Sequence, residues 1–209
     1  MKKARLRKGV LLVLEGIDGS GKSTQAGILL RKLRRLGYDS VRFREPTRGR
    51  WGREIRRKAV SENSLTPQEE LDLFVRDREE NVRKNLQPAL AAKKTIVLDR
   101  YYFSTIAYQG AKGIDPAKIR RINERFAARP DLVFILDLGA PEGMGRIEDR
   151  KKKYRLFERK DYLARVRKIF QGFKGRMFVH IDARGDKGQI ARVIWDHVEA
   201  LLRRNSTSI

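Results

Sequence analysis

The most informative stretch of this chain reads Val10-Leu11-Leu12-Val13-Leu14-Glu15-Gly16-Ile17-Asp18-Gly19-Ser20-Gly21-Lys22-Ser23-Thr24. Its first five residues are continuously apolar, which is typical of a strand that is buried on both faces. The following residues fit the pattern G-x-x-x-x-G-K-[ST], and an amphipathic segment, Thr24–Leu36, begins where that pattern ends. The order of strand, glycine-rich loop and helix predicts a phosphate-binding loop, and therefore a protein that binds a nucleotide.

The residue types of this loop suit phosphate chemistry. Glycines let the backbone curl so that successive N–H groups face phosphate oxygens, and the start of a helix adds the positive end of its dipole. Lys22 is expected to reach the β- and γ-phosphates, while the Ser23 hydroxyl is expected to bind Mg²⁺. The residues assigned to the nucleotide are Gly16, Ile17, Asp18, Gly19, Ser20, Gly21, Lys22, Ser23 and Thr24.

Working outward from the loop, strand-like and helix-like segments alternate along the chain. Four more short apolar runs are predicted as buried strands, namely Ser40–Phe43, Thr95–Leu98, Leu132–Leu136 and Met177–Ile181. Amphipathic segments with helical spacing lie between and after them, at Thr24–Leu36, Pro67–Leu86, Asp161–Phe173 and Gln189–Arg203. This alternation predicts an α/β fold with a five-stranded parallel sheet flanked by helices on both faces.

Composition limits the class of protein. The 209 residues suit a single domain, and they include 49 Lys plus Arg against 26 Asp plus Glu, which gives a net charge of +23. There is no Cys, so disulfides, Cys-ligated zinc, iron–sulfur clusters and thiol catalysis are excluded. The large positive charge indicates a polyanionic partner, and nucleic acid is one class of such partners.

Targeting segments are not expected. The N-terminal basic residues followed by apolar Val10–Leu14 superficially resemble a secretory signal, but five apolar residues are too few for the core of such a signal. No segment approaches the ~18 apolar residues of a membrane span. We therefore expect a cytoplasmic protein with no membrane partner.

A carboxylate and a guanidinium follow the third predicted strand. Thr95–Leu98 runs directly into Asp99 and Arg100, and in open α/β sheets this end of a strand faces the ligand crevice. Asp99 is therefore expected to hold Mg²⁺ directly or through water. Arg100 can bind a phosphate as a planar fork.

Motifs spread over nearly the whole chain resemble those of one enzyme family, the thymidylate kinases, which are P-loop nucleoside monophosphate kinases. Asp99-Arg100-Tyr101-Tyr102-Phe103-Ser104 with Ala107-Tyr108-Gln109-Gly110 resembles the D-R-Y-x-x-S-x-x-A-Y-Q-G stretch of that family. Similar in the same way are the loop at 13–24, the turn Phe43-Arg44-Glu45-Pro46-Thr47, the L-F-x-x-D-R motif at 73–78 and the P-D-L strand at 130–137. The resemblance implies ATP-dependent phosphorylation of dTMP to dTDP, for dTTP synthesis, with ATP and Mg²⁺ as cofactors.

The resemblance also implies an acceptor pocket. Its expected residues are Asp18, Glu45, Pro46, Phe74, Arg78, Arg100, Ser104, Tyr108 and Gln109. Phe74 and Arg78 share one helix face, and the family pattern assigns them to stacking on thymine and to donation to a base carbonyl. Gln109 offers both an acceptor and donors, which suits an imide edge. Arg100 would hold the acceptor phosphate, and Asp18 would accept from the 3′-hydroxyl.

The basic segment at about 141–160 is where the resemblance implies a mobile lid. In this family a catalytic arginine lies either in the P-loop or in the lid, and Gly19 occupies the P-loop position. The lid should therefore supply the charge that stabilises the transferring phosphoryl group. The common lid motif D-R-x-E is absent, so Arg146, Arg150 and Arg155 stay candidates. We favour Arg150, which joins Lys22, Arg100 and Asp18 as an expected catalytic residue.

Two alternative functions stay open at this point. The same fold could act on another pyrimidine monophosphate, such as dUMP, UMP or CMP. It could also have been repurposed to bind nucleic acid, which the +23 charge favours. Against the latter, the chain has no helix–turn–helix, RNP-type or OB-type pattern, and its basic residues are scattered. We therefore expect small-molecule partners, no nucleic acid, and the homodimer that the resemblance implies.

Overall fold

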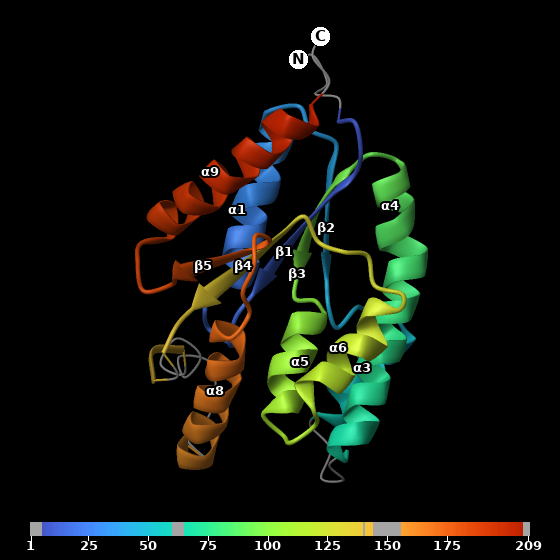
Figure 1. Ribbon diagram of the computed structural model, residues 1–209, viewed down its shortest axis with the longest axis vertical. Coiled ribbons are helices and arrows are strands. Elements are labelled where there is room, and N and C mark those ends of the chain that lie inside the picture. The colour runs from blue at the N-terminus through green and yellow to red at the C-terminus, as the bar shows by residue number, and fades with distance from the viewer. Residues whose placement is uncertain (1–5, 60–64, 140, 144–155, 207–209) are drawn as a thin grey trace.

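The computed structural model of the chain describes residues 6–59, 65–139, 141–143 and 156–206, of which 156–160 are described by their backbone alone. Its centre is a sheet of five parallel strands in the order β2–β3–β1–β4–β5 (Figure 1). The strands are β1 (Val10–Glu15), β2 (Ser40–Arg44), β3 (Thr95–Asp99), β4 (Leu132–Asp137) and β5 (Phe178–Asp182). The predicted α/β fold with its five-stranded parallel sheet is confirmed.

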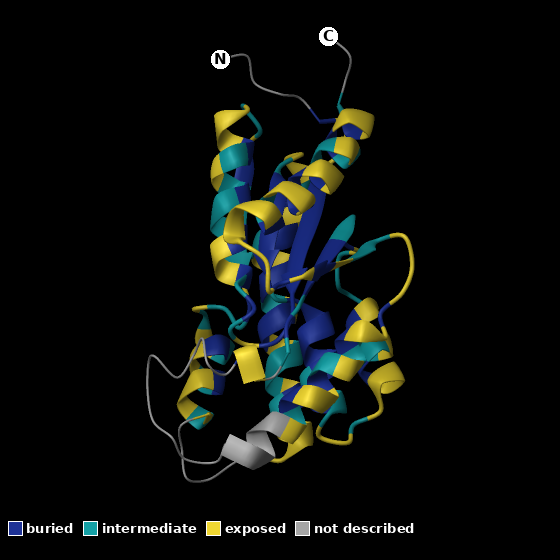
Figure 2. Ribbon diagram, turned by 90° about the vertical axis from the view of Figure 1, so that its left-hand side faces the viewer, coloured by how far each residue is buried: buried dark blue, intermediate teal, exposed yellow. Residues whose placement is uncertain are grey.

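Strand order explains which apolar runs are continuous. The inner strands β1 and β3 are buried along their whole length, whereas the edge strands β2 and β5 are partly exposed. Figure 2 shows the strands buried inside the molecule and the outward faces of the helices exposed. Burial on both faces removes the polar alternation that a half-exposed strand would need.

The strand register brings three functional segments to one edge of the sheet. Leu14 lies opposite Asp99 in the β1–β3 pair, and Arg44 lies opposite Asp99 in the β2–β3 pair. All strands run in the same direction, so the residues that follow β1, β2 and β3 emerge side by side. The P-loop, the turn at Glu45 and the turn at Arg100 therefore meet at this edge.

Helices surround the sheet in three groups (Figure 1). The first pairs α1 (Lys22–Arg35) with α9 (Lys187–Asn205), and the second is a continuous rod of α3 (Pro67–Asn81), the π-helical turn η1 (Val82–Leu86) and α4 (Gln87–Ala91), with α2 (Arg50–Lys58) packed against α3. The third group, beyond the carboxyl edge, is α5 (Tyr102–Gly110), α6 (Pro116–Glu124) and α8 (Leu156–Gln171).

Local sequence sets where the predicted helices begin. The helix predicted over Pro67–Leu86 starts at Pro67 because Thr66 and Glu69 form a reciprocal capping box, with proline at the first helical position. It then continues through η1 to Ala91. Predicted helices 24–36, 161–173 and 189–203 are present with ends shifted by up to five residues.

Among the described residues, the helices α2, α5 and α6 lie outside the segments predicted to be helical. In α5, seven of the nine residues are buried, so it has no exposed polar stripe that would reveal a helical period. Within the described part of the chain, no helix combines the length and apolar character needed to cross a membrane.

Candidate active site

The loop between β1 and α1 folds around its glycines and Lys22. Gly16, Gly19 and Gly21 have φ angles of 136°, 82° and 90°, which L side chains rarely adopt. The Lys22 ammonium donates to the Ile17 carbonyl at 2.6 Å and to the Ser20 hydroxyl oxygen at 3.3 Å. Burial lowers the pKa of Lys22 to about 7. These two contacts hold the Lys22 side chain inside the loop, in a buried position.

The two residues predicted to bind Mg²⁺ are in contact. Ser23 Oγ donates to Asp99 Oδ2 at 2.6 Å, and Asp99 Oδ1 is buried without a hydrogen-bond partner among the described residues. Arg42, which was not predicted here, donates to Asp99 Oδ2 at 3.0 Å. No group of three or more His, Cys, Asp or Glu side chains suited to a metal occurs in the described ranges. One hydroxyl and one free carboxylate oxygen fit Mg²⁺, which keeps most of its ligands as water and phosphate.

Four residues expected on the acceptor side form one cluster. Arg100 donates to Ser104 Oγ at 2.9 Å and to Asp18 Oδ1 at 2.5 Å. Tyr108 OH lies 3.3 Å from Asp18 Oδ2 and accepts from the Asp18 backbone N–H at 3.2 Å. Burial alone would raise the pKa of Asp18, but the charges of Arg100 and Lys22, together with the hydrogen bonds from Arg100 and Tyr108, outweigh burial and lower that pKa. The cluster is thus an ionised Asp–Arg pair at the mouth of the P-loop.

A buried carboxylate supports this cluster from below. Glu15, fully buried at the end of β1, accepts from the backbone N–H groups of Tyr101 and Ser104 at 2.8 and 3.1 Å and from the Ser104 hydroxyl at 2.5 Å. It therefore satisfies the N–H groups at the start of α5. The sequence does contain a signal for Glu15, because, like Asp99, it is a carboxylate that ends an apolar strand.

These groups open into a cavity of about 260 Å³. All nine residues predicted to bind the acceptor line this cavity. It also includes five that were not predicted, namely Arg44, Glu70, Tyr101, Thr105 and Tyr162. Tyr162 comes from α8, and its hydroxyl donates to the Tyr108 carbonyl at 3.0 Å. The cavity therefore joins segments from β2 to α8, which lie more than a hundred residues apart in the chain.

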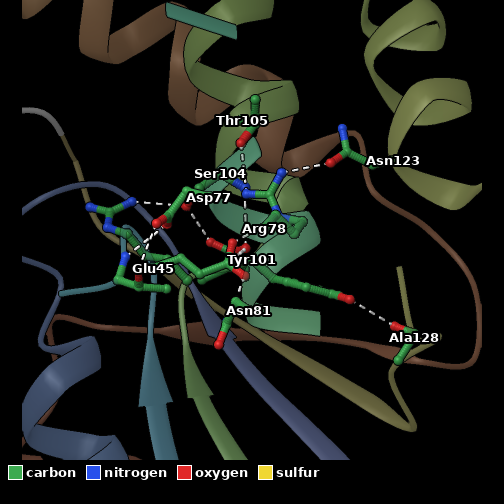
Figure 3. Close-up of polar contacts among 12 residues, drawn as sticks. Glu45, Asp77, Arg78, Asn81, Tyr101, Ser104, Thr105, Asn123 and Ala128 are labelled. Carbon is green, nitrogen blue, oxygen red and sulfur yellow. Dashed lines mark hydrogen bonds and ion pairs between the residues drawn. The ribbon is translucent and has the colours of Figure 1, made fainter. Parts of the chain in front are cut away.

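Two of the predicted pocket residues bind each other. Arg78 Nε donates to Glu45 Oε2 at 2.7 Å, and both side chains are almost fully buried (Figure 3). The other two guanidinium nitrogens donate to Asn123 at 2.6 Å and to Thr105 at 3.0 Å (Figure 3). Asn81 donates to the second Glu45 oxygen. A guanidinium has five N–H groups, so Arg78 has donors beyond these three contacts for a base carbonyl.

Phe74 and Gln109 line the cavity together with Arg78. Gln109 is 1% exposed, and its Nε2 donates to Glu70 at 2.9 Å. This end of the cavity therefore combines an aromatic ring with amide and guanidinium groups, which suits a planar heterocycle that has polar edges.

The predicted lid is described only at its ends. Arg146, Arg150 and Arg155 lie outside the described residues. Where the description resumes, α8 is tied to the end of β4 by Arg167, whose guanidinium makes two hydrogen bonds to Asp137 at 2.6 and 3.0 Å. The choice among the three lid arginines stays a prediction.

Comparison with known proteins agrees with this geometry. Residues 14–194 match the family model described as thymidylate kinase. A thymidylate kinase of Brachyspira hyodysenteriae is 43% identical over 92% of this chain and 94% of that protein. One from Akkermansia muciniphila is 45% identical over 88% and 89%, and a probable thymidylate kinase from Archaeoglobus fulgidus is 39% identical over 95% and 100%. With its P-loop, its Asp–Arg cluster and this similarity along most of its length, the chain belongs to the thymidylate kinase family.

Proposed function

We propose that this chain transfers the γ-phosphoryl group of ATP to dTMP, giving dTDP. The observation that carries the proposal is the 260 Å³ cavity, which collects all nine expected acceptor residues and includes Asp18 of the P-loop. A nucleoside monophosphate in this cavity would have its phosphate next to the loop that binds the donor. Membership of a family of nucleoside monophosphate kinases supports the same reaction.

Arg100 is proposed to position the acceptor phosphate. Its backbone has a φ of 72°, and its guanidinium is fixed by Ser104 and by Asp18. A dTMP phosphate bound there would have one oxygen held in line with the γ-phosphorus, which supplies much of the rate enhancement through orientation. Because that oxygen is already anionic near pH 7, no general base is needed. Asp18 would accept from the 3′-hydroxyl.

The base end of the cavity is proposed to recognise thymine. Phe74 would stack on the ring, one of the remaining N–H groups of Arg78 would donate to a base carbonyl, and Gln109 would pair with the imide edge. These groups come from the helices α3 and α5 and are buried or partly buried. Rigid elements of this kind hold a base with little loss of conformational entropy.

On the donor side, Lys22 and the loop residues 16–24 would hold the phosphates of ATP. Ser23 and Asp99 would hold Mg²⁺, which neutralises charge on the transferring phosphoryl group when it is bound. Arg42 contacts the Oδ2 oxygen of Asp99, so its positive charge would oppose the binding of the ion. Arg150 of the lid is proposed to add the last positive charge.

The wider setting is also a proposal. We infer a single kinase domain over residues 1–209 with its lid at about 141–160, acting in the cytoplasm as a homodimer. Light scattering coupled to size-exclusion chromatography measures the dimer directly.

A nucleotide-panel assay tests the function. The chain would be incubated with ATP, Mg²⁺ and one of dTMP, dUMP, UMP or CMP, with ADP release followed by a coupled enzyme system. We expect the highest kcat/KM with dTMP. Comparable or better turnover of CMP would overturn the assignment, and no turnover of any nucleotide would favour a chain repurposed for binding alone.

A further inference from the structure

Gln109 lies in the cavity with only one of its two polar ends engaged. Its Nε2 group donates to Glu70 Oε2 at 2.9 Å. Its Oε1 atom is buried and has no hydrogen-bond partner among the described residues. The side chain is 1% exposed, so bulk water does not compensate Oε1.

Glu70 fixes the orientation of the Gln109 side-chain amide. An ionised carboxylate can only accept hydrogen bonds, so it must face the amide N–H₂ group and cannot face the amide oxygen. Lys112 also donates to Glu70 Oε2, so this carboxylate oxygen accepts from an ammonium and from the Gln109 amide at once. The reversed amide would place two acceptor oxygens against each other, and the Gln109 Oε1 atom is therefore directed away from Glu70 Oε2.

In this orientation the buried Gln109 Oε1 atom lacks a hydrogen-bond donor among the described residues. An unsatisfied buried acceptor costs about 1–3 kcal/mol, and Gln109 and Glu70 line the same cavity as Phe74 and Arg78. A ligand that brings an N–H group to Oε1 removes that cost. A ligand that brings a lone pair to the same point adds repulsion between two acceptors.

We propose that Glu70 is a specificity-determining residue: by fixing the Gln109 amide it presents an acceptor to position 3 of a pyrimidine base. Thymine and uracil carry a hydrogen on N3, whereas N3 of cytosine is an acceptor. Glu70 thus selects dTMP and dUMP against dCMP through the Gln109 amide. The inference rests on the proposed function, because it takes the cavity to be the acceptor site.

The test replaces Glu70 by Gln and, separately, by Ala. Glu70→Gln keeps the size of the side chain but can both donate and accept, so it no longer fixes the amide. Glu70→Ala removes the partner altogether and serves if the first variant folds poorly. Asp72→Asn is the matched control, because it removes one negative charge from an exposed position of the same helix, where Asp72 contacts Gln68.

The measurement is kcat/KM for dTMP, dUMP and dCMP with ATP and Mg²⁺. We expect Glu70→Gln and Glu70→Ala to lower the dTMP-to-dCMP ratio by roughly 10–100-fold. The dTMP-to-dUMP ratio should stay within about 2-fold of its original value, because both bases carry the N3 hydrogen. Asp72→Asn should leave both ratios unchanged.

An unchanged dTMP-to-dCMP ratio in both Glu70 variants would overturn the inference while leaving the proposed function intact. An equal fall in kcat/KM for all three nucleotides would also overturn it, because that result indicates a merely structural role. If the original chain turns over none of them, the proposed function fails. In that case the dissociation constants of dTMP and dCMP are measured by calorimetry on the same variants. The preference for dTMP over dCMP, taken as the ratio of these constants, should fall in both Glu70 variants, and an unchanged ratio would overturn the inference.

Discussion

Replacing Glu15 by Gln should change how the stability of this protein depends on pH. Glu15 is fully buried at the end of β1, and burial raises its pKa to about 7, although its hydrogen bonds to Tyr101 and Ser104 and the charge of Arg100 act in the opposite direction. Gln has nearly the same shape as a protonated Glu. It keeps an oxygen for the two backbone N–H groups, but it cannot become negatively charged.

The magnitude follows from linkage between protonation and folding. The folded-state pKa of about 7 lies above the ordinary value of 4.5, so between these pH values the native protein holds a proton that the unfolded chain has released. The free energy of unfolding therefore falls as pH rises through this window. The Glu15 contribution to that fall is roughly 3 kcal/mol, complete above pH 7 and absent below pH 4.5.

The assay is urea denaturation of the wild-type chain and of Glu15→Gln at pH 5 and pH 8. The two proteins should have similar stability at pH 5, and the variant should be the more stable by about 2–3 kcal/mol at pH 8. Asp72→Asn, which removes an exposed carboxylate, is the control. Its difference in stability from the wild-type chain should not change between pH 5 and pH 8. Equal differences between wild type and Glu15→Gln at both pH values would refute the reasoning, because Glu15 would then carry the same charge in the native and unfolded states.

Three further substitutions test the site. Arg78→Met leaves the Glu45 carboxylate buried without its 2.7 Å partner, so urea denaturation should show a loss of about 3–5 kcal/mol, part of which Glu45→Gln restores in the double variant. Lys22→Met should lower kcat by roughly 100-fold or more, with a smaller change in KM for dTMP. A roughly 100-fold rise in KM with an unchanged kcat would contradict the proposed role of Lys22. Arg42→Met removes the positive charge that lies 3.0 Å from Asp99 Oδ2, so the half-saturating Mg²⁺ concentration should fall by about 2–5-fold in a magnesium titration of activity. A rise in that concentration would contradict the idea that the Arg42 charge opposes Mg²⁺ binding.

The sequence by itself determined the strands of the sheet and the phosphate loop, because each depends on a short run of consecutive residues. A strand that is buried on both faces is apolar over most of its length. The inner strands β1 and β3 meet that condition between their polar ends, which are Glu15 in β1 and Thr95 and Asp99 in β3. The glycines at 16, 19 and 21 occupy backbone conformations that few other residues adopt, so their spacing is visible without the fold. The nine acceptor residues came from a resemblance, and the cavity contains all of them.

Only the tertiary structure decided what those residues do to one another. The Glu45–Arg78 ion pair spans 33 positions, the Gln109–Glu70 hydrogen bond 39, and the Ser104–Glu15 hydrogen bond 89. Such partners depend on strand register and on how α3 and α5 pack together, and neither leaves a periodic signal. The helix α5 itself was missed because burial on nearly all sides hides its period. The sequence around a residue can indicate that the residue belongs to a site. Its charge, orientation and hydrogen-bond partner depend on neighbours that are distant in the chain and that the fold brings into contact with it.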